Sequence, residues 1–181
     1  GRVDPALADR NPRLNRALVE RFEPGSTVKP FTIAAALDGG TIRPEQLVDC
    51  QNGAMQVAEY VIHDSHPYQL LTPAQVLAFS SNIGTAKIAS TLGRAGLFRA
   101  FRRFGFGQDT GVPLPGETAG ILRHYRRWYE MDAATISFGQ GMSATTLQLA
   151  TAMRAVANEG KLMQPILVRR IVGPDGETVE Q

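Results

Sequence analysis

The sequence predicts an α/β chain in which helices outweigh strands. Three features predict this class: helical patterns in both halves, short apolar stretches separated by turn residues between 41 and 69, and a strand-like tail over 165–181. With 181 residues, 43% of them hydrophobic, the chain is long enough for one domain, or a large piece of one, with a substantial core.

The first expected helix lies in the segment STVKPFTIAAALDGG. A proline is tolerated only in the first turn of a helix, so Pro30 places its start at or just before Ser26. Gly39 and Gly40 then end it. Residues 41–69 show no long periodicity, and we expect loops there with one or two short strands.

Four more helices are expected further along the chain. Thr72 is a suitable N-cap and Pro73 a suitable first helical residue for a short helix that runs towards Ser80. NIGTAKIASTLG follows and is stopped by Gly93, and AGLFRAFRRFG has apolar residues at helical spacing. After a Gly/Pro-rich loop, SATTLQLATAMRAVANEG forms the last helix, closed by Gly160. The tail is expected to be a strand, a turn and the start of a second strand.

Composition excludes several classes of function. A net charge of +2 gives no electrostatic reason to expect a nucleic acid or a membrane surface as partner. No apolar run approaches the roughly 20 residues of a membrane span, and no signal-peptide pattern opens the chain. Cys50 is the only cysteine, which excludes an internal disulfide. We expect it to be a small buried side chain rather than a catalytic thiol, because no base is near it in sequence.

Ser26 and Lys29 form an S-x-x-K motif that places both side chains on one face of a helix, one turn apart. A serine hydroxyl is a weak nucleophile unless a base takes its proton, and a neutral lysine amine is able to do so. The segment VKPFTIAAAL is apolar nearly all round, so burial should disfavour the ammonium and lower the pKa of Lys29. The helix N-terminus would also offer the Ser26 N–H to a developing oxyanion. Such a motif is common, and alone it favours a helix cap at Ser26 beside a solvated Lys29 in the first turn.

Ser80, Ser81 and Asn82 lie in the short junction between two expected helices. A second serine in such a place relays a proton, and an asparagine amide binds a peptide carbonyl. Alone, this junction is also consistent with ordinary helix capping. S-x-x-K followed about 50 residues later by S-x-N is, however, the pattern of penicillin-recognising enzymes.

The sequence resembles the transpeptidase domain of class B penicillin-binding proteins, most closely the division-specific type. The similar stretches, in the family's order, are LNRALVERFEPGSTVKPF, SSNIGTAKIASTLG, FRRFGFGQDTGVPLPGETAGIL and TISFGQGMSATTLQLATAMRAVANEG. They span nearly the whole chain, and EPGSTVKPF followed by SSN is the most specific part.

The resemblance implies the fold of penicillin-binding proteins and β-lactamases, with residues 1–181 as a partial transpeptidase domain rich in helices. It implies Ser26 as the nucleophile, Lys29 as its general base, Ser80 as a proton shuttle, and Asn82 as the group that binds the substrate amide and orients Lys29. The substrates would be peptidoglycan stem peptides ending in D-Ala-D-Ala, and β-lactams would be inhibitors. No cofactor or metal is implied.

The resemblance also implies a cellular setting. The partners would be division and cell-wall synthesis proteins. The location would be the outer, periplasmic face of the cytoplasmic membrane, with an anchoring segment that is not in this chain.

The family's third motif, Lys-Thr/Ser-Gly, is missing from the chain. None of the three lysines, Lys29, Lys87 and Lys161, is followed by Thr or Ser and then Gly. In the family that motif lies well beyond the ANEG helix, so we interpret its absence as truncation and expect a sheet short of strand partners. The activity of these 181 residues alone is therefore left open.

Three alternative functions share the same motifs. A D,D-carboxypeptidase or β-lactamase would use water as the acceptor. A β-lactam sensor would be acylated without turning over, and an interaction module would have lost the chemistry.

Three other patterns are expected to be structural. His63 and His66 with Asp64 between them are conceivable as a metal site, but the segment is not clearly helical and His124 has no ligand context, so a surface loop is favoured. LRHYRRWY (122–129) resembles a single-strand nucleic-acid binder, but packing of Trp128 and Tyr125 beside solvated arginines is favoured. GFG and GQG are expected to be turns.

Overall fold

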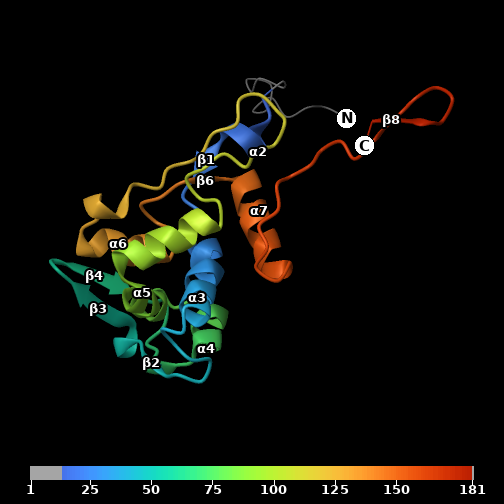
Figure 1. Ribbon diagram of the computed structural model, residues 1–181. Helices are drawn as coiled ribbons and strands as arrows, with labels where there is room; N and C mark the ends of the chain where they lie inside the picture. Colours follow the sequence, from blue (N-terminus) through green and yellow to red (C-terminus); the bar gives the residue numbers. More distant parts are fainter. Residues whose placement is uncertain (1–13, 181) are drawn as a thin grey trace, which may run out of the picture.

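The computed structural model describes residues 14–180 and places two packed helices at its centre (Figure 1). These are α3 (Lys29–Asp38) and α5 (Asn82–Arg103), with α4 (Pro73–Ala78) and α6 (Glu130–Ser137) packed against α5. The remaining helical elements are α2 (Arg16–Val19), α7 (Thr146–Ala157) and the 3-10 turns η1 (Gly25–Val28), η2 (Gln51–Gly53) and η3 (Tyr125–Arg127).

The strands are short and pair only in twos within residues 14–180. Each pair is antiparallel: β1 (Arg21–Phe22) with β6 (Ala144–Thr145), β2 (Val48–Asp49) with β5 (Leu70–Leu71), β3 (Ala54–Val57) with β4 (Tyr60–His63), and β7 (Ile171–Val172) with β8 (Thr178–Glu180). The expected α/β class with an incomplete antiparallel sheet is confirmed. Residues 41–69 hold three strands, more than the one or two expected, because β2 pairs with residues beyond that range.

The helix expected at Ser26 begins with a tighter turn. Gly25 to Val28 form the 3-10 turn η1, and α3 continues directly from Lys29. Pro30 lies in the first turn of α3, and Gly39 is its C-cap, as the sequence predicts. Ser26 is therefore in the 3-10 turn, and Lys29 is the first residue of the α-helix.

The two helices expected on either side of Gly93 are two halves of α5. Gly93 adopts φ 66° and ψ 167°, which is non-helical and which only glycine adopts readily, so the axis breaks there. The Thr72 cap is also confirmed, because its hydroxyl accepts from the Gln75 N–H in a capping box.

Helix α6 is an element that the sequence did not predict. Its apolar residues are spread around the helix rather than gathered on one face, so no helical pattern marks it. Its N-terminus is fixed by Asp132, whose carboxylate accepts from the Tyr129 N–H at 2.9 Å. Ile136 and Ser137 are its buried residues.

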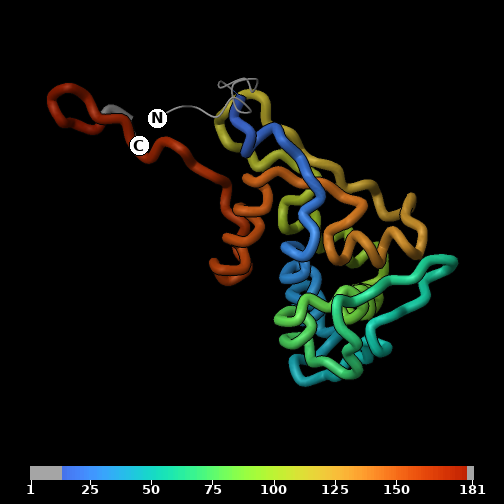
Figure 2. Tube along the Cα trace, turned by 180° about the vertical axis from the view of Figure 1, so that it is seen from behind, coloured from blue at the N-terminus to red at the C-terminus, as the bar shows by residue number. Residues whose placement is uncertain are grey.

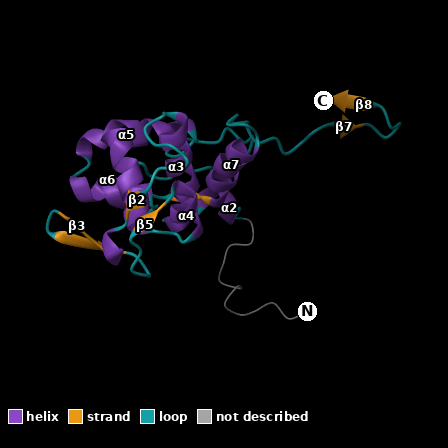
Figure 3. Cartoon of the chain, turned by 90° about the horizontal axis from the view of Figure 1, so that it is seen from below, coloured by secondary structure: helices purple, strands orange, loops and turns teal. Residues whose placement is uncertain are grey.

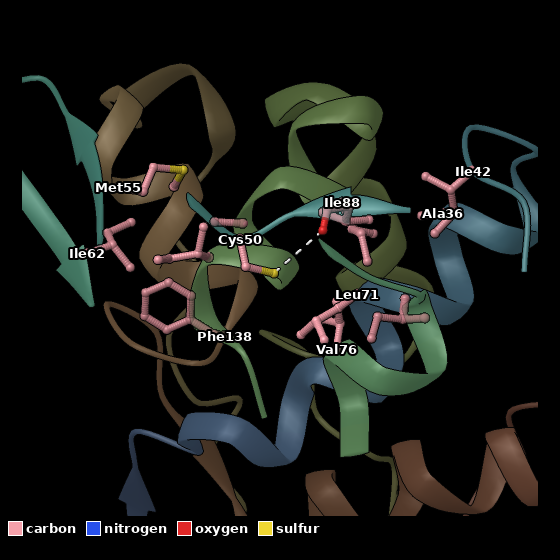
Figure 4. Close-up of a cluster of buried hydrophobic side chains, with 13 residues drawn as sticks. Ala36, Ile42, Cys50, Met55, Ile62, Leu71, Val76, Ile88 and Phe138 are labelled. Atoms are coloured by element: carbon pink, nitrogen blue, oxygen red, sulfur yellow. Dashed lines mark hydrogen bonds between the residues drawn. The ribbon is translucent and has the colours of Figure 1, made fainter. Parts of the chain in front are cut away.

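Helix α3 lies between two clusters of buried apolar side chains. Phe31 belongs to one cluster, with Leu97, Phe101 and Trp128. Ile33 and Ala36 belong to the other, which is drawn in Figure 4 and contains Cys50, Met55, Ile62, Leu71, Val76, Ile88 and Phe138. Because the helix is covered on both sides, a side chain near its N-terminus is held away from water.

The C-terminal segment stands away from the rest of the molecule. Figures 1, 2 and 3 show the β7–β8 hairpin projecting beyond α7 from every viewpoint. Its approach carries exposed apolar residues, among them Ile166 (76% exposed) and Val168 (63%). The strand–turn–strand expected for the tail is confirmed.

Cys50, Trp128 and the two glycine turns lie in the structural positions expected for them. Cys50 is fully buried, and burial raises the pKa of its thiol, which makes it a poor nucleophile. Trp128 packs in the core, while Arg126 and Arg127 are exposed. GFG and GQG lie in turns, and no metal-binding cluster occurs within residues 14–180. His66 lies in a surface loop as expected, whereas His63 ends strand β4.

No helix in the described part of the chain is both long enough and apolar enough to span a membrane.

Candidate active site

The structure brings together all four residues singled out in the two motifs. Ser26 and Ser80 are exposed, and Lys29 lies beneath them at 1% exposure. The Lys29 ammonium donates to the Ser80 carbonyl oxygen at 2.5 Å, to Ser80 Oγ at 2.9 Å and to Asn82 Oδ1 at 2.8 Å. All three donor positions of the side chain are thus occupied.

Ser80 joins the nucleophile to the lysine. Its Oγ lies 3.1 Å from Ser26 Oγ and 2.9 Å from Lys29 Nζ. Its backbone is left-handed, with φ 56°, an uncommon conformation for a serine, and its carbonyl and its hydroxyl both bind the lysine. The hydrogen-bonded path from Ser26 to Lys29 therefore runs through Ser80.

Burial lowers the pKa of Lys29 to about 8, from its ordinary 10.5. The cause is desolvation, which penalises the ammonium, and the negative charge of Asp64 opposes it in part. A lysine with a pKa of about 8 is neutral in roughly a tenth of the molecules at pH 7, against well under a thousandth at its ordinary pKa. It is therefore able to accept a proton from a neighbouring hydroxyl.

The position of Asn82 is set by both ends of its side-chain amide. Asn82 is the first residue of α5, and its Nδ2 donates to the His63 carbonyl at 3.0 Å. Its Oδ1 is thereby turned towards Lys29. The junction between α4 and α5 presents Ser80 and Asn82 to the same lysine, and the sequence predicted their place in this junction.

The turn that carries Ser26 rests on a glycine loop. The Gly25 N–H donates to the Gly139 carbonyl at 3.0 Å. A Cβ at Gly139 would lie 2.1 Å from the Gly25 oxygen, and φ there is 87°, so no other residue fits. Glu23 accepts from the Gly141 N–H at 2.8 Å and holds the same loop. The turn at GQG thus supports the nucleophile.

The sequence did not reveal the roles of Asp64, Ser81 or Glu23. Asp64 entered only as a member of a weak histidine pair, yet its carboxylate caps α5. Ser81 is buried and bonds to Asp64. No sequence signal identifies such pairs, because the partners lie well apart along the chain and meet only through the fold.

The chain matches the family model described as penicillin binding protein transpeptidase domain over residues 2–181. Among curated proteins, it is 35% identical to the probable peptidoglycan D,D-transpeptidase PenA of Neisseria meningitidis serogroup A, over 97% of this chain and 30% of the relative. It is 34% identical to the peptidoglycan D,D-transpeptidase FtsI of Escherichia coli, over 91% of this chain and 28% of that protein.

Solved structures agree with the sequence matches. The transpeptidase domain of Burkholderia pseudomallei penicillin-binding protein 3 superposes with a TM-score of 0.84 at 36% identity, over 94% of this chain and 50% of that one. Penicillin-binding protein 3 of Mycobacterium tuberculosis, complexed with aztreonam, gives 0.83 at 33% identity, over 92% of this chain and 38% of that one.

The chain spans about a third of the length of these curated relatives and half or less of these solved chains. Family model, sequence identity and fold agree with one another, and the S-x-x-K and S-x-N residues meet in space. The chain belongs to the penicillin binding protein transpeptidase domain family.

Proposed function

We propose that the protein is a serine-type peptidoglycan D,D-transpeptidase, with residues 1–181 forming the part of its catalytic domain that carries the nucleophile. One observation carries the proposal: an exposed serine is connected through Ser80 to a buried lysine whose pKa is lowered to about 8. The names of the relatives support the substrate class, since FtsI is named a peptidoglycan D,D-transpeptidase and PenA a probable one.

Acylation begins with neutral Lys29. It takes the proton of Ser80, which takes the proton of Ser26, and Ser26 Oγ attacks the carbonyl carbon of the penultimate D-Ala. The Ser26 N–H lies in the first turn of η1, where a backbone donor has no carbonyl of its own helix to bind, so it is available to the developing oxyanion. The C–N bond then breaks, the leaving amine takes the proton back along the path, and D-Ala departs.

The second half reverses the proton transfer. The amine of another stem peptide attacks the acyl-enzyme and loses a proton through Ser80 to Lys29. The ester bond to Ser26 breaks and Ser26 Oγ recovers its proton, which leaves a new peptide crosslink. The second N–H of Asn82 Nδ2, besides the one that His63 accepts, holds the substrate amide carbonyl, while Asn82 Oδ1 keeps Lys29 in place.

The same chemistry opens a β-lactam. Ser26 attacks the lactam carbonyl, and the leaving nitrogen stays tethered to the acyl group, so the adduct persists. The solved relative from Mycobacterium tuberculosis is complexed with aztreonam, a β-lactam. We propose penicillin and its analogues as inhibitors of this protein for the same reason.

The proposed setting follows from the proposed substrate. Peptidoglycan lies outside the cytoplasmic membrane, so the domain would work on the periplasmic side, anchored by a segment that is not in this chain. Proteins of the division and cell-wall machinery would be its partners, and the likeness to FtsI supports that choice.

The test is to follow a peptide ending in D-Ala-D-Ala in the presence of an acceptor amine. We expect D-Ala release together with an amide product, and neither with Ser26→Ala. Release with water alone as acceptor would identify a carboxypeptidase. A stable β-lactam adduct without any peptide turnover would identify a β-lactam sensor. If neither the peptide nor the β-lactam acylated Ser26, the interaction-module alternative would be favoured.

A further inference from the structure

Asp64 lies directly after strand β4, and its carboxylate reaches the start of α5. One oxygen accepts from the backbone N–H groups of Asn82 at 2.5 Å and Ile83 at 3.0 Å. The other accepts from the Ser81 hydroxyl at 2.5 Å. All three donors belong to the junction that presents Ser80 and Asn82 to the lysine.

The segment that carries Asp64 is itself held in place. Its backbone N–H donates to the Gly53 carbonyl at 3.1 Å, and the neighbouring His63 carbonyl accepts from Asn82 Nδ2 at 3.0 Å. His63 and Asp64 thus bind Asn82 at two places: the Asp64 carboxylate accepts from its backbone N–H, and the His63 carbonyl accepts from its side-chain amide. The amide oxygen that remains is the one bound by Lys29.

The carboxylate also acts on the lysine through its charge. Negative charge at Asp64 favours the ammonium form and works against burial, which lowers the pKa of Lys29. Ser80 and Asn82, which contact the lysine from the α4–α5 junction and α5, are neutral. The His63 imidazole is exposed on β4, and Asp49 and Lys87, which pair with each other, are the charged groups around Cys50.

We propose that Asp64 is a positioning residue of this active site, which locks the Ser80–Asn82 junction onto Lys29. The proposal deepens the proposed function and rests on it. Asp64 takes no part in bond making. It fixes the geometry of the proton path. By its charge it also sets the pH range in which Lys29 is neutral and able to accept a proton.

Two substitutions separate geometry from charge. Asp64→Asn removes the charge and the acceptor of the Ser81 hydroxyl, but its amide oxygen still accepts from the two backbone N–H groups, so the fold is retained. Asp64→Glu keeps the charge and displaces the carboxylate. Asp49→Asn is the matched control, because it removes an exposed acidic charge near the same junction.

The measurement is the rate of acylation by a fluorescent penicillin across a pH series. For Asp64→Asn we expect the plateau rate to fall by about 10²-fold, the cost of a small misplacement of reacting groups. The acid side of the profile should move to lower pH, because the lysine loses the charge that favours its ammonium. Asp64→Glu should lower the plateau without moving the profile, and Asp49→Asn should match the wild type.

A second readout is independent of activity. The ¹³C resonance of Lys29 Cε, followed by NMR against pH, should titrate at lower pH in Asp64→Asn than in the wild type. Wild-type acylation and wild-type titration in that variant would overturn the proposal, as would a rate loss that only follows a lower Tm with no change in pH profile. Failure of the wild type to be acylated, with the Lys29 titration still displaced in the variant, would overturn the proposed function and leave the role of Asp64 standing.

Discussion

At the scale of single residues, the reactive groups were predictable and their supports were not. S-x-x-K and S-x-N are short local signals, and the apolar run after Lys29 predicted its burial, which is confirmed at 1% exposure. The indirect path through Ser80 depends on two oxygens 54 residues apart in sequence that come to lie 3.1 Å from each other. Asp64 and Glu23 act through long-range contacts that local patterns do not encode.

The lowered pKa of Lys29 predicts a stability that depends on pH. The ammonium is disfavoured in the folded state, so the unfolded chain binds more protons between pH 8 and 10.5. The free energy of unfolding should therefore rise with pH through that window, by about 3 kcal/mol in all. Urea unfolding at a series of pH values measures it.

Lys29→Met is the control for this prediction, because it removes the titrating group and leaves every other lysine and tyrosine in place. The difference between the two proteins isolates the contribution of Lys29. A difference in unfolding free energy that stays flat from pH 7 to about 11 would show that the lysine keeps its ordinary pKa.

At the scale of elements, helix boundaries were predictable where one residue decides them. Thr72 and Pro73 begin α4, and Gly93 breaks α5, because caps, rigid φ values and positive φ are local properties. Helix α6 has no apolar face that would mark it, although Asp132 caps its N-terminus, and it is held by the neighbours it packs against. The strand pairs join residues from distant parts of the chain, so their register could not be read from the sequence.

The packing of α4 on α5 predicts a cost at Gly84. A Cβ there would lie 2.5 Å from Val76 Cγ2 and 3.0 Å from Ser81 Oγ, so Gly84→Ala should push the two helices apart. We expect a loss of about 1–3 kcal/mol in the free energy of unfolding, typical of overpacking, together with slower acylation because Ser81 is displaced. Ser90→Ala, an exposed position on the same helix, should change neither quantity. Equal stability of Gly84→Ala and Ser90→Ala would contradict this packing.

At the scale of the whole molecule, the packing of α3 against α5 brings the S-x-x-K and S-x-N motifs together into one site. The nucleophile and its base come with η1 and α3, whereas Ser80 and Asn82 come with the α4–α5 junction and α5. Two buried clusters hold α3 and α5 together, and the C-terminal hairpin takes no part in them. The site therefore depends on the core and not on the C-terminal arm, which comprises residues 166–180 with the β7–β8 hairpin.

This separation predicts how substitutions in the arm behave. Ile166→Ser and Val168→Ser remove apolar side chains that are already exposed, so each should change the free energy of unfolding by no more than about 0.5 kcal/mol. Phe101→Ala, in the core, should cost about 3–5 kcal/mol. Urea denaturation of the three variants distinguishes the arm from the core. If Ile166→Ser or Val168→Ser lowered the free energy of unfolding as much as Phe101→Ala, the arm would have to pack against the rest of the protein.

The most direct test of the central claim is to expose the chain to a β-lactam, measure its intact mass and map the modified peptide. The account predicts one adduct, on Ser26, whose rate of formation rises with pH through about 8, and which is absent in Ser26→Ala. Slow or absent labelling in Lys29→Met would accompany it. An adduct on any other residue, or undiminished labelling of Ser26→Ala, would contradict the assignment of the nucleophile.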